Sequence, residues 1–358
     1  MSVHTLSATE ALARLAEFHT IIDARSEAEH ALDHVPGALN WPTLDNQQRI
    51  EIGTLYKQVN PFEARKRGAA IAARNIAAHV EREVFDKPKG WQPLVYCWRG
   101  GQRSGALATI LGAIGFRVTL IEGGYKAWRA ALVSALPAQS QRLSYRVVCG
   151  PTGSGKTRLL HALAAQGAQV LDLEALANHR SSVLGQIPGV PQPGQKRFES
   201  LVWDALRGFD PARVVYVESE SRKVGNLRVP EALMENMRAS PCVDLQLDDA
   251  ERVALLLEDY DFFVKDPAAF CERLGALTEL RGKAVVSAWI HKIEQGRTPE
   301  VVLELLTGHY DPMYAQSIGR NFTQFAQALP LALRDRSPSS LASAAQALIA
   351  SESPPPPA

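Results

Sequence analysis

Short apolar runs alternate with amphipathic stretches along the first 135 residues of the chain. A capped helix is expected from Ser7 to Leu15, and a long helix over about 61–85. The apolar runs predict strands at residues 19–23, 94–96 and 115–121. Strands that alternate with helices favour a parallel sheet covered on both faces. The pattern therefore predicts a first α/β domain over residues 1–135.

The same alternation returns in the second half of the chain. A strand over 145–149 leads through a glycine-rich loop into a helix, and further strands are expected at 170–174 and 213–220. From about residue 248 the pattern becomes helical and amphipathic. We predict, in order, a P-loop α/β domain over 136–247, a helical subdomain over 248–325, a strand and helix over 326–350 that complete the P-loop domain, and a disordered tail over 351–358.

The composition limits the compartment and the partners. The 358 residues carry a net charge of +1, so contact with nucleic acid must come from a local basic patch. The four cysteines contain no C-x-x-C pair, which disfavours zinc and a disulfide framework and favours a reducing compartment. The sequence shows neither a secretory signal pattern nor an apolar run of about 18 residues. We therefore expect a cytoplasmic protein without membrane contact and without haem, flavin or zinc.

The segment over residues 96–104 is the first candidate site. Its strand ends at Cys97, two glycines follow, and a helical pattern begins near Arg103. A thiol at the start of a helix and beside Arg99 and Arg103 lies in a positive field that stabilises its thiolate and favours an anion. Cys97 is therefore a candidate nucleophile, although a buried, inert core cysteine is the alternative. The rest of the predicted anion-binding loop consists of Trp98, Gly100, Gly101, Gln102 and Ser104.

Residues on either side of this loop form a wider pattern. Ile22-Asp-Ala-Arg25, the segment 34–40, Cys97 and Glu122-Gly-Gly-Tyr-Lys-Ala-Trp128 together resemble a rhodanese domain over about 130 residues. Rhodanese domains move sulfur through a cysteine persulfide, which implies that Cys97 is the carrier. The spacing departs from the usual sulfurtransferase loop, because Arg103 completes a C-x5-R-S pattern that resembles the phosphatase loops of the same fold. A larger loop should accept a bulkier anion, so phosphatase chemistry remains open at this point.

The clearest motif of the second half covers residues 150–157, Gly-Pro-Thr-Gly-Ser-Gly-Lys-Thr. It follows a strand and opens a helix, which is the context that the G-x-x-x-x-G-K-T pattern requires. Backbone N–H groups of such a loop wrap a phosphate, Lys156 neutralises it, and Thr157 is a candidate ligand for Mg²⁺. The motif does not identify the phosphate compound. The predicted phosphate-binding residues are Gly150, Gly153, Ser154, Gly155, Lys156 and Thr157.

Charged residues follow the later strands of this half. Asp172 and Glu218 lie at strand ends, where P-loop proteins keep a carboxylate that binds the metal ion or its water. The alternative for Glu218 is a solvated strand end. Basic residues that are candidates for contact with nucleic acid phosphates, or for a solvated rim, are Arg180, Lys196, Arg197, Arg222 and Lys223. The helical subdomain is a candidate for contact with RNA, and its Tyr310 and Tyr314 are candidates for base stacking or, alternatively, for a core.

The order of the two motifs carries a more specific resemblance. A rhodanese-like domain with the Cys97 loop, followed by the P-loop and by Val217-Glu-Ser-Glu-Ser-Arg-Lys-Val-Gly225, resembles the tRNA 2-selenouridine synthase family over nearly the whole chain. The resemblance implies a tRNA substrate with 2-thiouridine at the wobble position and selenophosphate as the selenium donor. It also implies that geranyl diphosphate first alkylates the sulfur and that selenium then displaces the geranyl thiol. The synthetase that supplies selenophosphate is a candidate partner.

These implications assign a chemical role to each motif. Alkylation converts the sulfur on the pyrimidine ring into a thiolate that can leave. The P-loop would then bind the diphosphate of the prenyl donor, and Lys156, Thr157 and Mg²⁺ would stabilise its departing charge. Cys97 has two open roles, because it either carries selenium as a perselenide or assists expulsion of the thiol. The C-x5-R loop suits a selenophosphate anion better than a bare sulfur.

Two other functions remain open on the sequence. A rhodanese-family sulfurtransferase or phosphatase with a nucleotide-binding regulatory domain would turn over thiosulfate or a phosphoester without RNA. A P-loop kinase whose rhodanese domain is a binding module would depend on Lys156 and be indifferent to Cys97.

Overall fold

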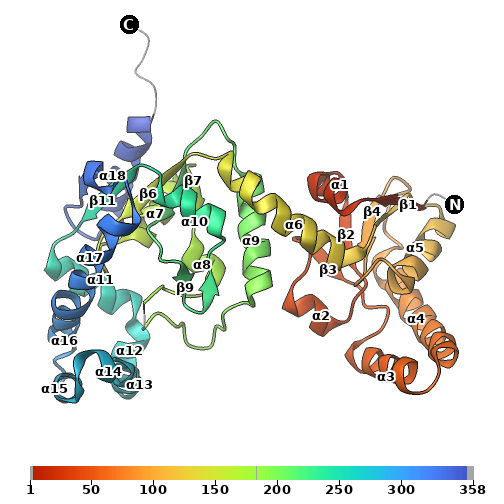
Figure 1. Cartoon of the computed structure of the whole chain (residues 1–358), viewed down its shortest axis with the longest axis horizontal. Helices are drawn as coiled ribbons and strands as arrows, with labels where there is room; N and C mark the ends of the chain where they lie inside the picture. Colours follow the sequence, from red (N-terminus) through yellow and green to blue (C-terminus); the bar gives the residue numbers. More distant parts are fainter. Residues whose placement is uncertain (1–2, 183, 353–358) are drawn as a thin grey trace, which may run out of the picture. The chain divides into compact units, whose positions relative to one another are not determined.

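A computed structural model describes residues 3–182 and 184–352 of the chain. These residues form two compact units, each built on a five-stranded sheet whose neighbouring strands are parallel (Figure 1). Unit 1 contains residues up to Pro137 together with Pro193–Asp204, and unit 2 contains Ala138–Gln192 and the residues from Ala205 onward. The predicted class, two parallel-sheet α/β domains with additional helices, is confirmed.

The sheet of unit 1 has the strand order β1-β5-β4-β2-β3. Its strands are β1 (Val3–Leu6), β2 (Thr20–Asp23), β3 (Ala38–Asn40), β4 (Pro93–Tyr96) and β5 (Val118–Ile121). Its helices are α1 (Ala8–Ala13), the short η1 (Leu15–Glu17), α2 (Glu27–Leu32), α3 (Asn46–Gln58), α4 (Pro61–Glu83) and α5 (Gln102–Ile114). Two further helices, α6 (Gly124–Gln141) and α9 (Gln195–Gly208), have residues in both units.

Local sequence explains where the helices of unit 1 begin. The hydroxyl of Ser7 accepts the N–H of Glu10, and the carboxylate of Glu10 accepts the N–H of Ser7, so a capping box starts α1. Ile76 of α4 and Leu107 of α5 are fully buried against the sheet in one apolar cluster. This packing fixes α5 against the sheet, and α5 begins at the candidate thiol loop.

The sheet of unit 2 has the order β12-β11-β6-β8-β7, with β6 in the middle. Its strands are β6 (Tyr145–Cys149), β7 (Gln169–Leu171), β8 (Val215–Glu218), β11 (Cys242–Gln246) and β12 (Leu329–Ala332). A two-stranded hairpin is formed by β9 (Lys223–Val224) and β10 (Leu227–Arg228). The helices that accompany this sheet are α7 (Lys156–Ala165), α8 (Leu173–Ala177), α10 (Glu231–Arg238) and α18 (Pro338–Glu352).

Helix α18 packs beside α7 in the apolar cluster that covers the middle of this sheet. The strand β12 and helix α18 therefore belong to the P-loop unit, although the helical region separates them from it in the sequence. Ser351 and Glu352, the first residues of the predicted tail, are the end of α18. The rest of that tail, 353–358, lies outside the described residues.

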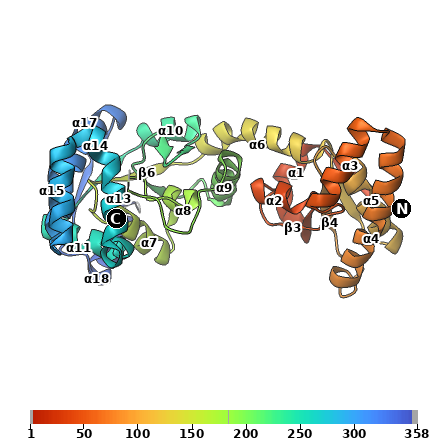
Figure 2. The same ribbon diagram turned by 90° about the horizontal axis from the view of Figure 1, so that it is seen from below.

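The region between β11 and β12 is helical, as predicted (Figures 1 and 2). This region has an apolar core of its own. Phe263, Phe270, Leu274 and Trp289 are buried in this core. Its elements are α11 (Asp249–Asp259), α12 (Asp261–Lys265), α13 (Pro267–Leu274), η2 (Gly275–Leu277), α14 (Thr278–Arg281), α15 (Lys283–Glu294), α16 (Thr298–Leu305), η3 (Leu306–Tyr310), α17 (Asp311–Asn321) and η4 (Phe325–Gln327). Within the described residues, every helix is too short or too polar to cross a membrane.

Candidate active sites: a thiol loop and a phosphate loop

Strand β4 places Cys97 at the carboxyl edge of the first sheet. Cys97 follows the last residue of β4, and the loop over residues 97–101 leads into α5. The Cys97 sulfur accepts hydrogen bonds from the backbone N–H of Gly101 at 3.3 Å and from the hydroxyl of Ser104 at 3.1 Å. These donors fix the sulfur at the start of a helix, where free N–H groups favour anions. Cys97 is only 3% exposed, so a reacting atom must enter the loop to reach the sulfur.

The two arginines of this loop have different environments. Arg99 is exposed on the loop, where its guanidinium is accessible to an incoming anion. Arg103 donates to the Glu29 carboxylate at 2.7 Å, and Arg49 pairs with the same carboxylate at 2.9 Å. Burial opposes ionisation of Glu29, but the hydrogen bond and charge of Arg103, the N–H of Ser26 and the charge of Arg49 together outweigh it and lower the pKa of this carboxyl below its ordinary value. Glu29 therefore orients Arg103, a role that the sequence analysis did not assign to it.

The Gly123-Gly124 pair at the start of α6 lies close to the backbone of the thiol loop. The backbone N–H of Tyr125 donates to the carbonyl of Cys97 at 2.8 Å, and the Tyr125 ring stacks on Trp98 with 5.4 Å between ring centroids. Gly124 has a φ of +59°, and a Cβ at this position would lie 2.3 Å from the carbonyl oxygen of Cys97. Position 124 therefore requires glycine, because the backbone of the thiol loop leaves no room for a Cβ there.

The phosphate loop follows β6, the middle strand of the second sheet. Gly150, Gly153 and Gly155 have φ angles of +151°, +78° and +88°, which confirms the glycine-dependent turn that the motif predicts. The ammonium of Lys156 donates to the carbonyl of Gly150 at 2.7 Å, so it lies folded over the loop. The hydroxyl of Ser154 is buried and, among the described residues, makes no hydrogen bond.

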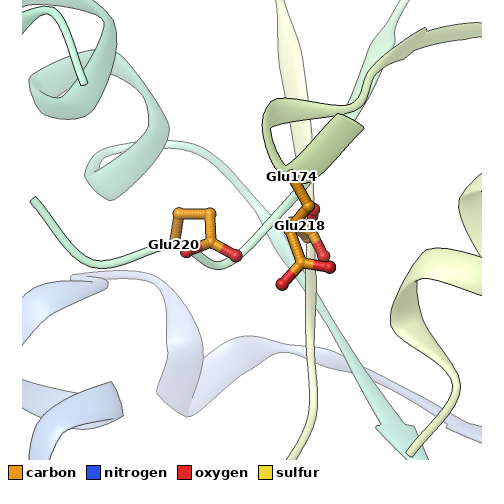
Figure 3. A group of neighbouring side chains, drawn as sticks. All are labelled: Glu174, Glu218 and Glu220. Atoms are coloured by element: carbon orange, nitrogen blue, oxygen red, sulfur yellow. The ribbon is translucent and has the colours of Figure 1, made fainter. Parts of the chain in front are cut away.

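Three glutamates gather beside the first turn of α7. Glu174, Glu218 and Glu220 come from α8, the end of β8 and the loop after β8, and their ligand oxygens lie within 4.8 Å of one another (Figure 3). The hydroxyl of Thr157 lies 3.2 Å from a Glu174 oxygen and 3.3 Å from a Glu218 oxygen. The second carboxylate oxygen of Glu218 is buried without a hydrogen bond in the part of the chain that the structure describes. Carboxylate and hydroxyl oxygens are ligands that suit Mg²⁺.

Burial and mutual repulsion make these carboxyls weak acids. Burial, followed by the charge of Glu220, raises the pKa of Glu174 to about 8. Burial and the charge of Glu174 raise the pKa of Glu218 well above its ordinary value, and burial raises the pKa of Glu220. Carboxylates packed in this way need a cation or protons to remain together. The residues present therefore fit a divalent cation at this position.

Some predicted residues occupy other places. Asp172 lies outside the group of three glutamates, because its carboxylate caps α8 through the N–H of Ala175 and pairs with His161 at 3.0 Å. Glu174 and Glu220 were not predicted as ligands, although each is the last residue of an expected strand, 170–174 and 213–220. Their only signal in the sequence is acidity near β7 and β8.

The five basic residues predicted to contact tRNA are divided between the two units. Lys196 and Arg197 belong to unit 1, and Arg197 donates to the carbonyl of His34 at 3.3 Å. Arg222 and Lys223 are exposed at the hairpin of unit 2. Arg180, also in unit 2, lies over the Tyr260 ring at 4.8 Å and donates to the carbonyl of Asp259. Arg180 therefore supports the local fold, whereas Lys196, Arg222 and Lys223 are accessible to a polyanion.

The two candidate tyrosines of the helical region are largely enclosed. Burial raises the pKa of Tyr310 and of Tyr314 above the ordinary range of a tyrosine. Tyr310 packs against the apolar core of the helical region. Its position matches the alternative interpretation, a core residue, better than a platform for a base.

The fold and these sites define a class of two-module proteins, in which a rhodanese-like thiol loop is joined to a P-loop unit. Comparison with known families supports this division into two modules. The model of the rhodanese-like domain matches residues 7–131, and the model described as the tRNA 2-selenouridine synthase AAA domain matches residues 143–295.

Individual relatives extend the match to most of the chain. A tRNA 2-selenouridine synthase of Shewanella denitrificans is 30% identical over 348 residues, covering 88% of this chain and 92% of that relative. One of Cupriavidus necator is 34% identical over 340 residues, covering 84% and 90%. One of Nitrosomonas europaea is 35% identical over 247 residues, and that alignment covers 67% of this chain and 63% of the relative. The chain belongs to the tRNA 2-selenouridine synthase family.

We predict that Gly124→Ala distorts the thiol loop. The added methyl group would lie 2.3 Å from the Cys97 carbonyl oxygen and 2.4 Å from the Gly100 nitrogen, so the loop must shift. We expect a loss of roughly 1–3 kcal/mol in the free energy of unfolding and a changed rate of Cys97 alkylation by iodoacetamide. Gly115→Ala is the control, since its φ is also positive but its Cβ would meet no atom within 4 Å. Equal stability and equal alkylation rates in the two variants would contradict this role.

We also predict a link between pH, Mg²⁺ and stability. The pKa of Glu174 is about 8 in the folded state against an ordinary value of 4.5, so the folded state binds this proton more tightly than the unfolded state. The free energy of unfolding should therefore fall as the pH rises from about 4.5 to about 8, by at most about 1.4 kcal/mol per pH unit for each such proton.

Mg²⁺ should restore stability at high pH, where the carboxyls are ionised. We expect Mg²⁺ to raise Tm at pH 8.5 more than at pH 5, and Glu218→Gln to remove most of that difference. Glu235→Gln, at an exposed position of α10, is the matched control and should respond like the original chain. If Tm at pH 8.5 does not depend on Mg²⁺, the three glutamates do not bind this cation.

Proposed function

We propose that this chain replaces the sulfur of wobble 2-thiouridine in tRNA by selenium from selenophosphate, through an S-geranylated intermediate made from geranyl diphosphate. The observation that carries the proposal is the pairing, in one chain of this family, of a thiol loop built for an anion with a P-loop flanked by carboxylates. Its relatives are named for 2-selenouridine synthesis in tRNA and extend over both units.

The first half of the proposed reaction is alkylation at the phosphate loop. The thiouridine sulfur forms a bond to the first carbon of the prenyl chain, the carbon–oxygen bond breaks, and diphosphate leaves with the electron pair. The ring nitrogen gives its proton to water, which makes the product neutral. Backbone N–H groups of residues 150–157 and the Lys156 ammonium bind the departing diphosphate and stabilise its charge. The same arrangement would bind ATP, but alkylation does not require ATP.

The glutamates beside the loop would hold Mg²⁺. Thr157, Glu174, Glu218 and Glu220 supply oxygen ligands. One Glu218 oxygen, which has no hydrogen-bond partner among the residues that the structure describes, is available for an ion. When bound, the ion would neutralise diphosphate oxygens and make diphosphate a better leaving group. Lys156, which folds onto the loop carbonyls in this structure, would turn to the diphosphate.

The second half of the proposed reaction is exchange of the chalcogen at the thiol loop. The selenium of selenophosphate forms a bond to the pyrimidine carbon, and the carbon–sulfur bond breaks as geranyl thiolate leaves. Water then attacks phosphorus, the phosphorus–selenium bond breaks with its electron pair remaining on selenium, and phosphate is released. Gly101 N–H, Arg99 and Arg103 bind the selenophosphate anion beside the Cys97 sulfur. Cys97 acts in this half and not in the alkylation.

Removal of the thiol should therefore separate the two halves. We expect Cys97→Ala to convert thiolated tRNA into S-geranylated tRNA at an unchanged rate and to lower 2-selenouridine formation by at least about 100-fold. The measurement is mass analysis of tRNA nucleosides after incubation with geranyl diphosphate and selenophosphate. Cys271→Ala, in α13, is the thiol control and should retain both activities. Equal loss of both products in Cys97→Ala would refute the separation.

Removal of the Lys156 ammonium from the P-loop should stop the alkylation of the thiouridine sulfur. We expect Lys156→Ala to weaken binding of geranyl diphosphate and to slow S-geranylation by about 100-fold or more, since one charge stabiliser at a leaving group contributes that much. Lys265→Ala, in which an exposed lysine of α12 is lost, is the control. If Lys156→Ala geranylates tRNA at an unchanged rate, the loop is not the binding site of the diphosphate. Consumption of ATP or a phosphoester by the original chain, with the thiolated base left unaltered, would favour the kinase or phosphatase alternative.

A further inference from the structure

An apolar cavity lies against the phosphate loop of unit 2. Its volume is about 60 Å³, and it is partly open to solvent. Thr152 of the loop forms one part of its wall, and most of the remaining wall comes from side chains of α11, α12, α16 and η3. Ser182, Leu184, Tyr260 and Phe270 complete it. Its apolar lining includes Leu256, Leu257, Phe263, Val302 and Leu306.

The wall and the phosphate loop are held together by a buried arginine. Arg252, in the first turn of α11, is 4% exposed and donates to the carbonyl of Thr152 at 3.0 and 2.8 Å. Its guanidinium also pairs with Asp311 at 2.6 Å and with Asp249 at 2.8 Å. These bonds fix α11 to the loop, so the position of the cavity relative to the phosphate-binding N–H groups is set by the fold.

Direct packing makes the cavity and the loop continuous. A Cβ at Gly153 would lie 3.0 Å from the side chain of Leu256, which shows how closely this leucine approaches the loop. Leu256 lines the cavity as well. A ligand whose anionic end lies on the N–H groups at 153–157 therefore has an apolar surface beside it.

The size and lining of the cavity favour a short hydrocarbon. By the measure that roughly 10–15 Å³ holds one water, about 60 Å³ is room for several waters or for a chain of several carbons. The lining is almost wholly apolar, so water in it would lack partners, whereas a hydrocarbon would bury apolar surface on both sides. A nucleotide base needs hydrogen-bonding groups to orient it, and this lining offers few.

Resting on the proposed function, we infer that this cavity binds the hydrocarbon chain of the prenyl diphosphate whose diphosphate lies on the P-loop. The diphosphate and the hydrocarbon of the donor are then bound by adjacent parts of unit 2, and the cavity selects the length of the hydrocarbon. The inference concerns the helical region, which supplies most of the wall and for which the sequence predicted contact with tRNA.

The test compares three ligands of the full chain by calorimetry in the presence of Mg²⁺. We expect geranyl diphosphate to bind roughly 10-fold or more tightly than dimethylallyl diphosphate or inorganic pyrophosphate, since the longer chain buries more apolar surface. Val302→Phe fills the cavity. It should weaken the binding of geranyl diphosphate by roughly 10-fold and change the affinity for pyrophosphate by no more than about 2-fold.

Two further variants make the test specific. Leu303→Phe is the matched control, since Leu303 is the next residue of α16, is 40% exposed and lies outside the cavity wall. Leu257→Gln, which puts an amide into the wall, replaces Val302→Phe if the latter lowers Tm severely. It should reduce the preference for geranyl diphosphate in the same way.

Each outcome has a separate meaning. Suppose that the original protein prefers geranyl diphosphate but that both cavity variants bind it as tightly as Leu303→Phe does. The hydrocarbon of the donor then lies outside this cavity, and the inference fails while the proposed function stands. If geranyl diphosphate binds no more tightly than pyrophosphate, the cavity does not read the hydrocarbon and the inference fails. If neither ligand binds, the P-loop is not a diphosphate site, and the proposed function fails with the inference.

Discussion

Both candidate sites depend on one constraint: the first N–H groups of a helix have no partner within that helix. In each unit a parallel strand ends in a glycine-containing loop that turns directly into a helix, β4 into α5 and β6 into α7. Such a turn directs N–H groups at whatever occupies the loop. At the first site this occupant includes the Cys97 sulfur, which accepts the N–H of Gly101. At the second, the Lys156 ammonium closes over loop carbonyls, and the N–H groups are suited to a phosphate.

The charges around the two loops are balanced in opposite ways. At the thiol loop the arginines are in excess, and Glu29 restrains Arg103 while Arg99 remains exposed. At the phosphate loop the half-buried Glu174 and the buried Glu218 and Glu220 oppose one lysine, and burial raises their pKa values. The first arrangement accepts an anion as it stands. The second accepts one together with a cation, which is the form in which diphosphates bind to proteins of this kind.

The sequence predicted the strands and loops that carry both motifs, because strand–glycine–helix patterns are local. It did not predict α3, which has no buried residue and so no apolar period to detect. Nor could it select Glu174 and Glu220 over Asp172, since all three are acidic residues near strand ends and only packing decides which oxygens meet. The assignment of Lys196 and Arg197 to the compact unit of the first domain is likewise a matter of tertiary contacts, and no local signal precedes it.

The central claim is that the phosphate loop makes an intermediate that the thiol loop consumes. The most direct measurement supplies that intermediate to a chain that cannot make it. Lys156→Ala is given tRNA already S-geranylated at the wobble base, together with selenophosphate, and the nucleosides are analysed by mass. The account predicts 2-selenouridine at the rate of the original chain. If the original chain forms 2-selenouridine from the geranylated tRNA and Lys156→Ala does not, the two loops do not act in sequence and the account is contradicted.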